Sequence, residues 1–166
     1  MATATTLRYA TRNDLSESIR VKMDELLNAT LADAIDLQLQ AKQAHWNVKG
    51  PDFIALHKLF DEVYQGITEY VDGLAERCVQ LGGIADGTLS NVSRRTRLPA
   101  YPLQLADGKS HVEALSAALA AFGKTIRAAI DEAGNAGDMD TADLFTEISR
   151  GTDKWLWFVE AHLQGG

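Results

Sequence analysis

The most constraining feature of the chain is the stretch from Lys42 to Gly83, in which a Gly-Pro break precedes a long helical pattern. Gly50 and Pro51 separate two runs of helical apolar periodicity, because proline lacks the amide hydrogen that a continuing helix needs. Almost no loop separates the runs, so the two helices are predicted to form an antiparallel hairpin. The second helix is predicted to take Asp52 as its N-cap and to end at Leu81.

This second helix carries a stripe of metal-binding residue types. At about 100° per residue, with His57 at zero, Asp61 falls at roughly 40°, Asp72 at roughly 60° and Glu76 at roughly 100°. The apolar residues fall on the arc from about 200° to 320°, the side that an amphipathic helix turns to its core. They are Leu56, Leu59, Phe60, Val63, Ile67, Tyr70, Val71, Leu74 and Cys78. The stripe is therefore predicted to face away from the core of the chain.

Axial spacing decides how this stripe could bind a metal ion. His57 and Asp61 are i,i+4 neighbours that can reach one ion, and Asp72 and Glu76 form a second such pair. Asp61 and Asp72 lie roughly 16 Å apart along a helix, far beyond the reach of one ion. Two copies packed antiparallel about a two-fold axis would join the pairs, and His45 would complete each half. The alternative is a solvated charged face with a capping histidine, although such faces usually include lysine or arginine.

The remaining sequence predicts further helices and no strands. Residues 1–13 are predicted to be a short N-terminal tail, and residues 14–166 one helical domain. Capping-box spacing opens the first helix at Asp14 and the fourth at Ser110. The connection after Gly83 is long for a compact domain and is predicted to carry a short helix of its own. The predicted helices cover 14–48, 52–81, 88–95, 110–134 and 140–163, with GNAGD as the last loop. This is an all-α, four-helix bundle with one long connection.

Composition narrows the class of protein. The chain has 166 residues, a net charge of −7 and 46% hydrophobic residues, which fits one globular domain. No run approaches the roughly 18 apolar residues of a membrane span, and no signal pattern opens the chain, so a cytoplasmic protein is expected. The last third, from His111 onward, is acidic, which favours cations over nucleic acid. The one cysteine, Cys78, is predicted to be a buried small hydrophobe.

Several catalytic and metal-binding motifs are missing. The chain contains no Glu-x-x-His, the usual ligand motif inside a di-iron four-helix bundle. It also lacks G-x-S-x-G, a phosphate-binding glycine loop and a C-x-x-C pair. His111 and His162 fall outside any ligand pattern and are interpreted as structural. The outer stripe therefore remains the best candidate for a metal site.

The motifs KQAHWNVKGPDF, ALHKLFDE and VDGLAERCVQLGG resemble the signature of the Dps family, the twelve-subunit mini-ferritins. DTADL and DKWLWFVE extend the resemblance over nearly the whole chain. It implies a ferritin-like four-helix bundle with a short extra helix in the long connection. It also implies a ferroxidase that oxidises Fe(II) to Fe(III), with hydrogen peroxide as the preferred oxidant, and stores ferric oxide inside a hollow dodecamer built from two-fold dimers. The residues that match the family's two-iron centre, shared between subunits, are His45, His57, Asp61, Asp72 and Glu76.

The resemblance suggests two further roles. The residue matching Trp46 lies beside the iron site in the family and can intercept radicals, although a tryptophan at such a position more often fills a core or an interface. Family members also have acidic pores where three subunits meet. Their matching region here contains Asp138, Asp140 and Asp143, although aspartate at a helix start is also a common cap.

The main alternative function is that of a nucleoid-associated DNA-binding protein with iron oxidation secondary. Many members of the family hold DNA through a lysine-rich N-terminal tail, whereas this chain has only Arg8 and Arg12 before Lys22. DNA binding is therefore expected to be weak or absent. The run Arg94-Arg95-Thr96-Arg97 is a second basic candidate, and its simpler role is solubilising or interface charge. A third alternative is a helical dimer without chemistry.

Overall fold

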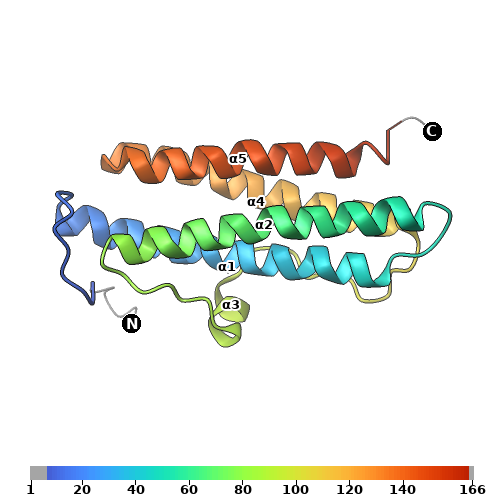
Figure 1. Ribbon diagram of the computed structural model, residues 1–166, viewed down its shortest axis with the longest axis horizontal. Helices are drawn as coiled ribbons and strands as arrows, with labels where there is room; N and C mark the ends of the chain where they lie inside the picture. The colour runs from blue at the N-terminus through green and yellow to red at the C-terminus, as the bar shows by residue number, and fades with distance from the viewer. Residues whose placement is uncertain (1–6, 165–166) are drawn as a thin grey trace.

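The protein folds into two helical hairpins packed against each other (Figure 1). A computed structural model describes residues 7–164, which form five α-helices and no β-strand. The first hairpin contains α1 and α2, the second contains α4 and α5, and α1 also contacts α4 while α2 contacts α5. The helices are α1 (Glu17–Asn47), α2 (Phe53–Gln80), α3 (Leu89–Arg95), α4 (Gly108–Ala136) and α5 (Met139–Glu160). The predicted four-helix bundle with a short extra helix in its long connection is confirmed.

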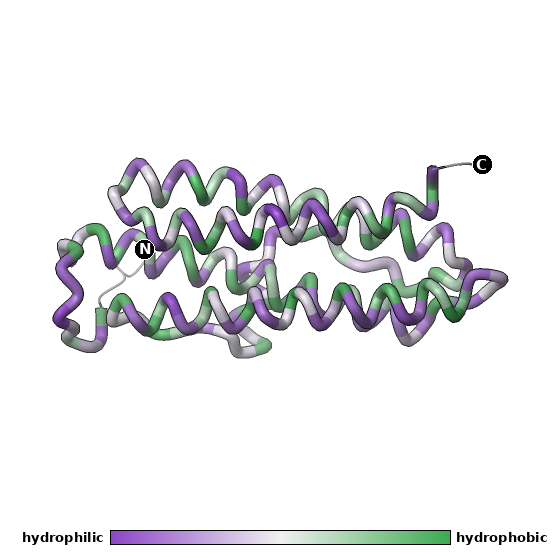
Figure 2. Tube along the Cα trace, turned by 45° about the horizontal axis from the view of Figure 1, so that its top comes forward, coloured by the Kyte–Doolittle hydropathy of each residue, from purple (hydrophilic) through white to green (hydrophobic). Residues whose placement is uncertain are grey.

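The core forms where the apolar faces of the four long helices meet. Hydrophobic and hydrophilic residues alternate along each helix in Figure 2, as expected when one face is buried and the other meets water. On α2 the predicted apolar set behaves as expected: Leu59, Tyr70 and Val71 are partly buried and the other members are fully buried. The largest fully buried side chains include Phe60, Phe122, Phe145, Leu31, Leu37 and Leu74. No helix within residues 7–164 is long and apolar enough to cross a bilayer.

Glycines let α5 approach α2 closely. A Cβ atom on Gly66 of α2 would lie 2.5 Å from the indole nitrogen of Trp155, and one on Gly151 of α5 would collide with the hydroxyl of Tyr70. In one contact α2 supplies the glycine and α5 the aromatic ring, and in the other contact the roles of the two helices are reversed. Of the bulky residues near the end of α5, Val159 is fully buried, whereas Trp155, Leu156 and Phe158 are partly exposed.

The predicted cap of the first helix is wrong by two residues. Ser16, not Asp14, is the N-cap, and its hydroxyl accepts a hydrogen bond from the N–H of Ile19. The physical reason is a local turn before the helix: the N–H of Leu15 donates to Oδ1 of Asn13, 3.0 Å away, which holds these residues outside the helix. Asp52 does occupy the N-cap position of α2, although its side chain caps none of the described backbone N–H groups.

The predicted starts of α4 and α5 are also corrected by their caps. Asp107 is the N-cap of α4, and its two carboxylate oxygens accept from the N–H and the hydroxyl of Ser110, the residue predicted to be the cap. Asp138 caps α5 through the N–H of Thr141, so this helix begins at Met139 rather than at Asp140 or Thr141. In both helices the capping oxygen comes from an aspartate that lies three residues before the residue whose N–H it accepts from.

The predicted GNAGD loop is mostly helix. α4 continues to Ala136, and only Gly137 and Asp138 separate it from α5. Gly137 has φ of 90° and ψ of 12°, the left-handed conformation that ends many helices and that glycine adopts without steric cost. The asparagine and first glycine of the loop motif are therefore absorbed into the last turn of α4.

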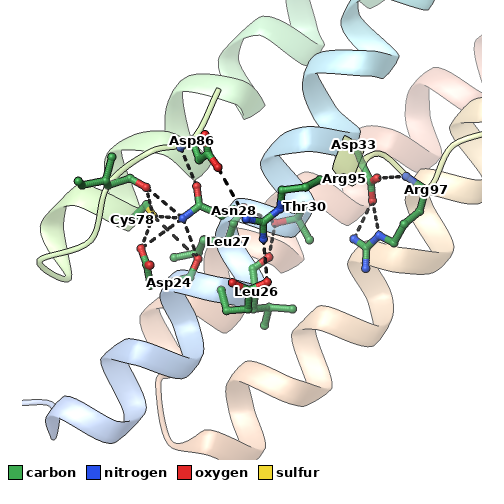
Figure 3. A network of polar contacts seen from close by, with 12 residues as sticks. Asp24, Leu26, Leu27, Asn28, Thr30, Asp33, Cys78, Asp86, Arg95 and Arg97 are labelled. Atoms are coloured by element: carbon green, nitrogen blue, oxygen red, sulfur yellow. Dashed lines mark hydrogen bonds and ion pairs between the residues drawn. The ribbon is translucent and has the colours of Figure 1, made fainter. Parts of the chain in front are cut away.

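The long connection between α2 and α4 lies along α1, and buried polar groups of α1 fix it there (Figure 3). The amide of Asn28 donates to the carbonyl oxygen of Ile84 and to the sulfur of Cys78, and its oxygen accepts from the N–H of Asp86. Further along, the fully buried carboxylate of Asp33 accepts two hydrogen bonds from the guanidinium of Arg97 and one from its N–H. The connection is thus held by backbone and side-chain contacts on both sides of α3.

Cys78 is buried in the hydrophobic core as predicted, and its sulfur also contacts polar groups. Its Sγ donates to Oδ1 of Asp24 at 2.7 Å. Burial raises the pKa of the Cys78 thiol and also that of the Asp24 carboxyl. A Cβ atom on the neighbouring Gly83 would collide with the same carboxylate, which explains why glycine suits this position. The pair joins the start of α1 to the end of α2.

Candidate metal centre

The break between α1 and α2 places two predicted ligands side by side. The rings of His45, near the end of α1, and His57, in the first turns of α2, stack with centroids 3.7 Å apart and an angle of 22° between their planes. Nδ1 of His45 lies 2.7 Å from the carbonyl oxygen of His57, and Nδ1 of His57 lies 2.8 Å from that of His45. Each imidazole is therefore oriented by the backbone of the other helix.

These hydrogen bonds determine which nitrogen of each ring is available. A carbonyl oxygen only accepts, so Nδ1 carries a proton in both His45 and His57. In the neutral ring Nε2 then keeps a free lone pair, and a ring fixed in this way is the usual arrangement of a metal-binding histidine. Both side chains are partly exposed, so these lone pairs are accessible from the outer surface of the hairpin.

Asp61 lies one helical turn after His57 on the same stripe. Its carboxylate accepts a hydrogen bond from Lys42 of α1 and another from Gln65, 3.1 Å away. The hydrogen bond from the Lys42 ammonium lowers the pKa of Asp61 below its ordinary value, and His45 adds a smaller contribution in the same direction. Asp61 is therefore ionised at neutral pH and available as an oxygen ligand.

Lys42 is a neighbour of the stripe that the helical pattern of α2 does not predict. It reaches Asp61 from α1, so the stripe has a cation beside it although α2 itself places none within it. Its ammonium group pairs with Asp61 and lies 4.5 Å from the ring centre of Tyr64. The signal was present in the sequence, since Lys42 precedes His45 by three residues and so lies one turn away on the same side of α1.

Asp72 and Glu76 lie further along α2, and both are exposed. With His57 and Asp61 only partly buried, the whole stripe faces away from the core. Within residues 7–164, no three His, Cys, Asp or Glu side chains are close enough together to hold one metal ion. One chain therefore presents two separate groups of ligand types: His45, His57 and Asp61 at one end of α2, and Asp72 and Glu76 toward the other.

The other predicted site residues differ in accessibility. Trp46 follows His45 and is 64% exposed, an unusual position for so large an apolar side chain. Asp138 is buried, caps α5 and pairs with the guanidinium of Arg77 at 2.9 Å. Asp140 and Asp143 are exposed in the first turns of α5. These two are therefore the acidic side chains of this segment that solvent reaches.

Basic residues near the N-terminus and α3 are held close to the bundle. The backbone N–H groups of Arg8 and Tyr9 donate to the carbonyl oxygen of Gly82, and both side chains are exposed. The first six residues of the predicted tail lie outside the described residues. In the basic run from Arg94 to Arg97, Arg95 pairs with Glu25 at 2.8 Å and Arg97 pairs with Asp33 at 2.7 Å. These two arginines therefore have structural partners.

Comparisons with known proteins agree with this architecture. The model of the ferritin-like domain matches residues 24–165. The DNA protection during starvation protein of Agrobacterium fabrum is 47% identical over 156 residues, which cover 94% of this chain and 96% of that protein. The solved structure of DpsA14 from Streptomyces coelicolor superposes with a TM-score of 0.92 at 32% identity, covering 99% of this chain and 96% of that one.

A second solved structure, Dps from Microbacterium arborescens in the high iron form, has a TM-score of 0.85 and 33% identity, covering 90% of this chain and 97% of that one. The agreement includes the whole bundle, since the matches extend over all four long helices. On the matched domain, the identity and the coverage, this chain belongs to the Dps family of ferritin-like proteins.

Proposed function

We propose that this protein is a ferroxidase whose two-iron centre is shared between two copies of the chain. The observation that carries the proposal is the division of the ligand types on α2 into two groups, neither of which is sufficient alone. His57 and Asp61 have the same i,i+4 spacing as Asp72 and Glu76. An antiparallel two-fold arrangement of α2 against its copy therefore sets each pair opposite the other, twice.

The ligand set suits Fe(II) as the substrate. Three carboxylates and two imidazoles combine the oxygen and nitrogen donors that first-row divalent metals accept, and no thiolate is present. With hydrogen peroxide as oxidant, two Fe(II) ions each lose one electron and the O–O bond accepts both. Overall, 2 Fe²⁺ + H₂O₂ + 2 H₂O gives 2 FeO(OH) and 4 H⁺. Nε2 of each imidazole, left without a backbone partner, and the ionised Asp61 would bind the substrate ions.

Storage of the ferric product inside a hollow dodecamer is the second part of the proposal. It is supported by the similarity of the whole chain to Dps proteins, including one solved in a high iron form. Removing ferrous iron and peroxide together would protect DNA and other cell components from oxidative damage. We also propose that Trp46, which follows His45 in the chain and is exposed, intercepts radicals formed at the centre.

Mixing two inactive variants tests the shared centre. His57→Ala/Asp61→Ala removes one group of ligands, and Asp72→Ala/Glu76→Ala removes the other. In a mixed dimer both lesions fall in one centre, and the other centre is whole. Refolded mixtures should therefore recover iron oxidation, measured by absorbance of the ferric product, up to about half of the wild-type rate per mixed pair.

The control is each variant refolded alone, which should assemble normally and stay inactive. If both parents assemble, the mixed species is shown to form, and the mixture still oxidises no iron above the parents, the shared centre is refuted. Recovery that appears only in the mixture cannot come from a site within one chain.

Direct DNA binding is the second candidate function, and the described residues do not favour it. Arg95 and Arg97 are engaged in ion pairs, and the backbone at Arg8 is bonded to the end of α2. We therefore propose iron removal, rather than DNA contact, as the principal protective activity.

A further inference from the structure

A groove between α1 and α4 lies apart from the ligand stripe, which is on α2. It measures about 430 Å³, a volume in the range of pockets that bind small molecules. Alanines of α4 form much of its wall, and their small side chains leave open the space that larger residues would fill. The apolar side chains that line it are Leu26, Ala121, Ala128 and Ala129.

Two of the polar side chains that line the groove already have partners. The hydroxyl of Thr125 donates to the carbonyl oxygen of Ala121 at 3.2 Å. Glu132 pairs with Lys22 of α1 at 3.4 Å, so the charge of this carboxylate is balanced at one end of the groove. The other polar residues of the lining are two cations, Arg97 and Lys124.

Arg97 is held by a buried partner and still reaches the surface (Figure 3). Its Nε and Nη2 donate to Oδ2 of Asp33, which is fully buried. The Arg97 side chain nevertheless remains 48% exposed, and its Nη1 makes no hydrogen bond with the described residues. Asp33 therefore balances the charge of Arg97 and fixes the guanidinium, while Nη1 keeps N–H groups that can donate to a bound oxygen.

Lys124 carries the uncompensated charge of the groove. It is exposed, and it forms no ion pair or hydrogen bond within residues 7–164. Because Arg97 and Glu132 are each balanced by a partner, the ammonium group of Lys124 leaves one net positive charge. A single uncompensated cation beside an apolar wall favours a ligand with a single negative charge.

The register of α1 and α4 places the two cations at the same end of the groove. Lys22 pairs with Glu132, and Gln40 borders a second hollow together with Ala114, so the two helices are antiparallel. By this register Leu26 lies opposite Ala128, and Asp33 lies opposite Ala121. Arg97, bonded to Asp33, is therefore at the height of Ala121, and Lys124 follows roughly 4.5 Å further along α4. The apolar part of the groove continues from there toward Glu132.

We propose that this groove binds a small carboxylate with an apolar chain, of the chemical class of a medium-chain fatty acid. The carboxylate lies between the ammonium group of Lys124 and Nη1 of Arg97, and the chain extends along Leu26 and Ala128. Burial of the chain against these side chains supplies the apolar part of the affinity. A phosphate dianion would bring a second negative charge that no side chain of the groove balances. The site uses no residue of the proposed iron centre and is independent of it.

Titration calorimetry of the iron-free protein with octanoate is the first test. Octanoate should bind saturably, with one site per chain. Acetate has only the head group and octanol only the chain, so each should bind at least roughly tenfold more weakly than octanoate. Inorganic phosphate should show no saturable binding. Absence of saturable octanoate binding, or equal affinities for octanoate and octanol, would overturn the proposal.

Substitutions at exposed positions of α4 test where the ligand lies. Lys124→Gln should weaken octanoate binding roughly tenfold, because it removes a charged partner of the carboxylate. Lys109→Gln, on the same helix outside the groove, removes the same charge and should leave the affinity unchanged. Ala128→Trp should block binding by filling the groove, whereas Ala120→Trp, exposed outside it, should not.

The lysine pair decides the outcome if a tryptophan variant disturbs assembly. Equal losses of octanoate affinity in Lys124→Gln and Lys109→Gln would reduce the effect to general charge and reject the site. Unchanged affinity in Lys124→Gln would reject it as well.

Discussion

Lys42 forms an ion pair with the carboxylate of Asp61, the group that would bind a metal ion. Its ammonium group donates to Asp61, so the positive charge expected from iron is already supplied in the single chain. The pair is partly exposed, with 23% of the Lys42 side chain and 31% of the Asp61 side chain accessible. In such a setting an ion pair contributes modestly. The lysine can therefore keep Asp61 ionised and oriented while still yielding it to a metal ion.

We predict that Lys42→Gln strengthens Fe(II) binding. Without the ammonium group, the metal ion no longer competes for Asp61, and the gain should be about two- to fivefold in affinity, the size expected for a partly exposed ion pair. Anaerobic titration calorimetry with Fe(II) measures it. Lys58→Gln, an exposed lysine adjacent to His57, is the control for a general change of charge. Weaker binding in Lys42→Gln would show that the lysine supports the site instead.

His111 is a buried residue whose protonation would lower the stability of the folded chain. It is 1% exposed at the start of α4, its Nδ1 lies 2.6 Å from the hydroxyl of Tyr101, and its Nε2 has no hydrogen-bond partner among the described residues. Burial lowers the pKa of His111; the backbone of Leu105 and the charge of Asp107 oppose this shift in part, and Lys49 reinforces it. The interpretation of His111 as structural agrees with this environment.

The sign of the effect follows from proton linkage. The unfolded chain binds a proton at His111 near its ordinary pKa of 6.5, whereas the folded chain resists it, so stability is lost as pH falls through that value. We predict that His111→Asn makes the urea midpoint less sensitive to pH between about 7 and 5. His162→Asn, at an exposed position, should leave the slope unchanged. An unchanged slope in His111→Asn would assign the pH dependence to other groups.

At the scale of helices, the aspartates at the start of α5 differ in role: one is a structural cap, and the other two are exposed to solvent. Asp138 is committed to capping Thr141 and pairing with Arg77. Asp140 is the second residue of α5 and Asp143 lies about one turn further along the helix; both are exposed. The acidic segment that matches the family's pore region therefore contains one structural carboxylate, Asp138, and two exposed carboxylates that ions can reach.

We predict opposite phenotypes for these positions. Asp140→Asn/Asp143→Asn should slow iron uptake at low ferrous concentration, because it removes charge that concentrates cations, with little loss of stability. Asp138→Ala should instead lower the free energy of unfolding by about 1–3 kcal/mol, through the lost cap and the unpaired Arg77, and leave uptake per assembled shell unchanged. Stopped-flow uptake and urea unfolding distinguish the two. Normal uptake in the double variant would remove the proposed entry role.

At the scale of the whole molecule, charge opposes contact with nucleic acid. Each copy carries a net charge of −7, so an assembly of many copies repels a duplex. Linked weak contacts from several tails act in the opposite direction, since avidity can raise affinity by roughly 10²–10⁴ where geometry permits. The tail residues that the structure describes do not offer long reach, because Arg8 and Tyr9 are bonded to Gly82.

We predict little or no DNA binding at physiological salt. A gel shift with supercoiled plasmid across a salt series should show complexes only at low salt, because phosphate contacts weaken steeply as salt rises. Arg8→Gln/Arg12→Gln should abolish those complexes if the tail makes them. Complexes that persist at about 150 mM salt, and that disappear when residues 1–12 are deleted, would restore the nucleoid-associated function.

The sequence alone determined the helices, the hairpin and the outward stripe on α2, because each depends on the 3.6-residue period and on where apolar side chains gather. It also determined the gap between Asp61 and Asp72, since the rise of a helix is fixed. The ends of helices were less predictable. Asp14, Ser110 and Asp140 each had plausible capping chemistry, and the choice among neighbouring oxygens depended on turns and contacts outside the helix.

Only the tertiary structure decided which side chains of one helix contact the neighbouring helix. Lys42 belongs to the candidate site because α1 lies antiparallel to α2 at a particular height, and no periodicity within either helix specifies that height. The same register orients His45 and His57 through each other's carbonyl oxygens and places Trp46 on the outer surface. Local patterns follow from chain geometry, whereas contacts between helices follow from how their side chains pack together.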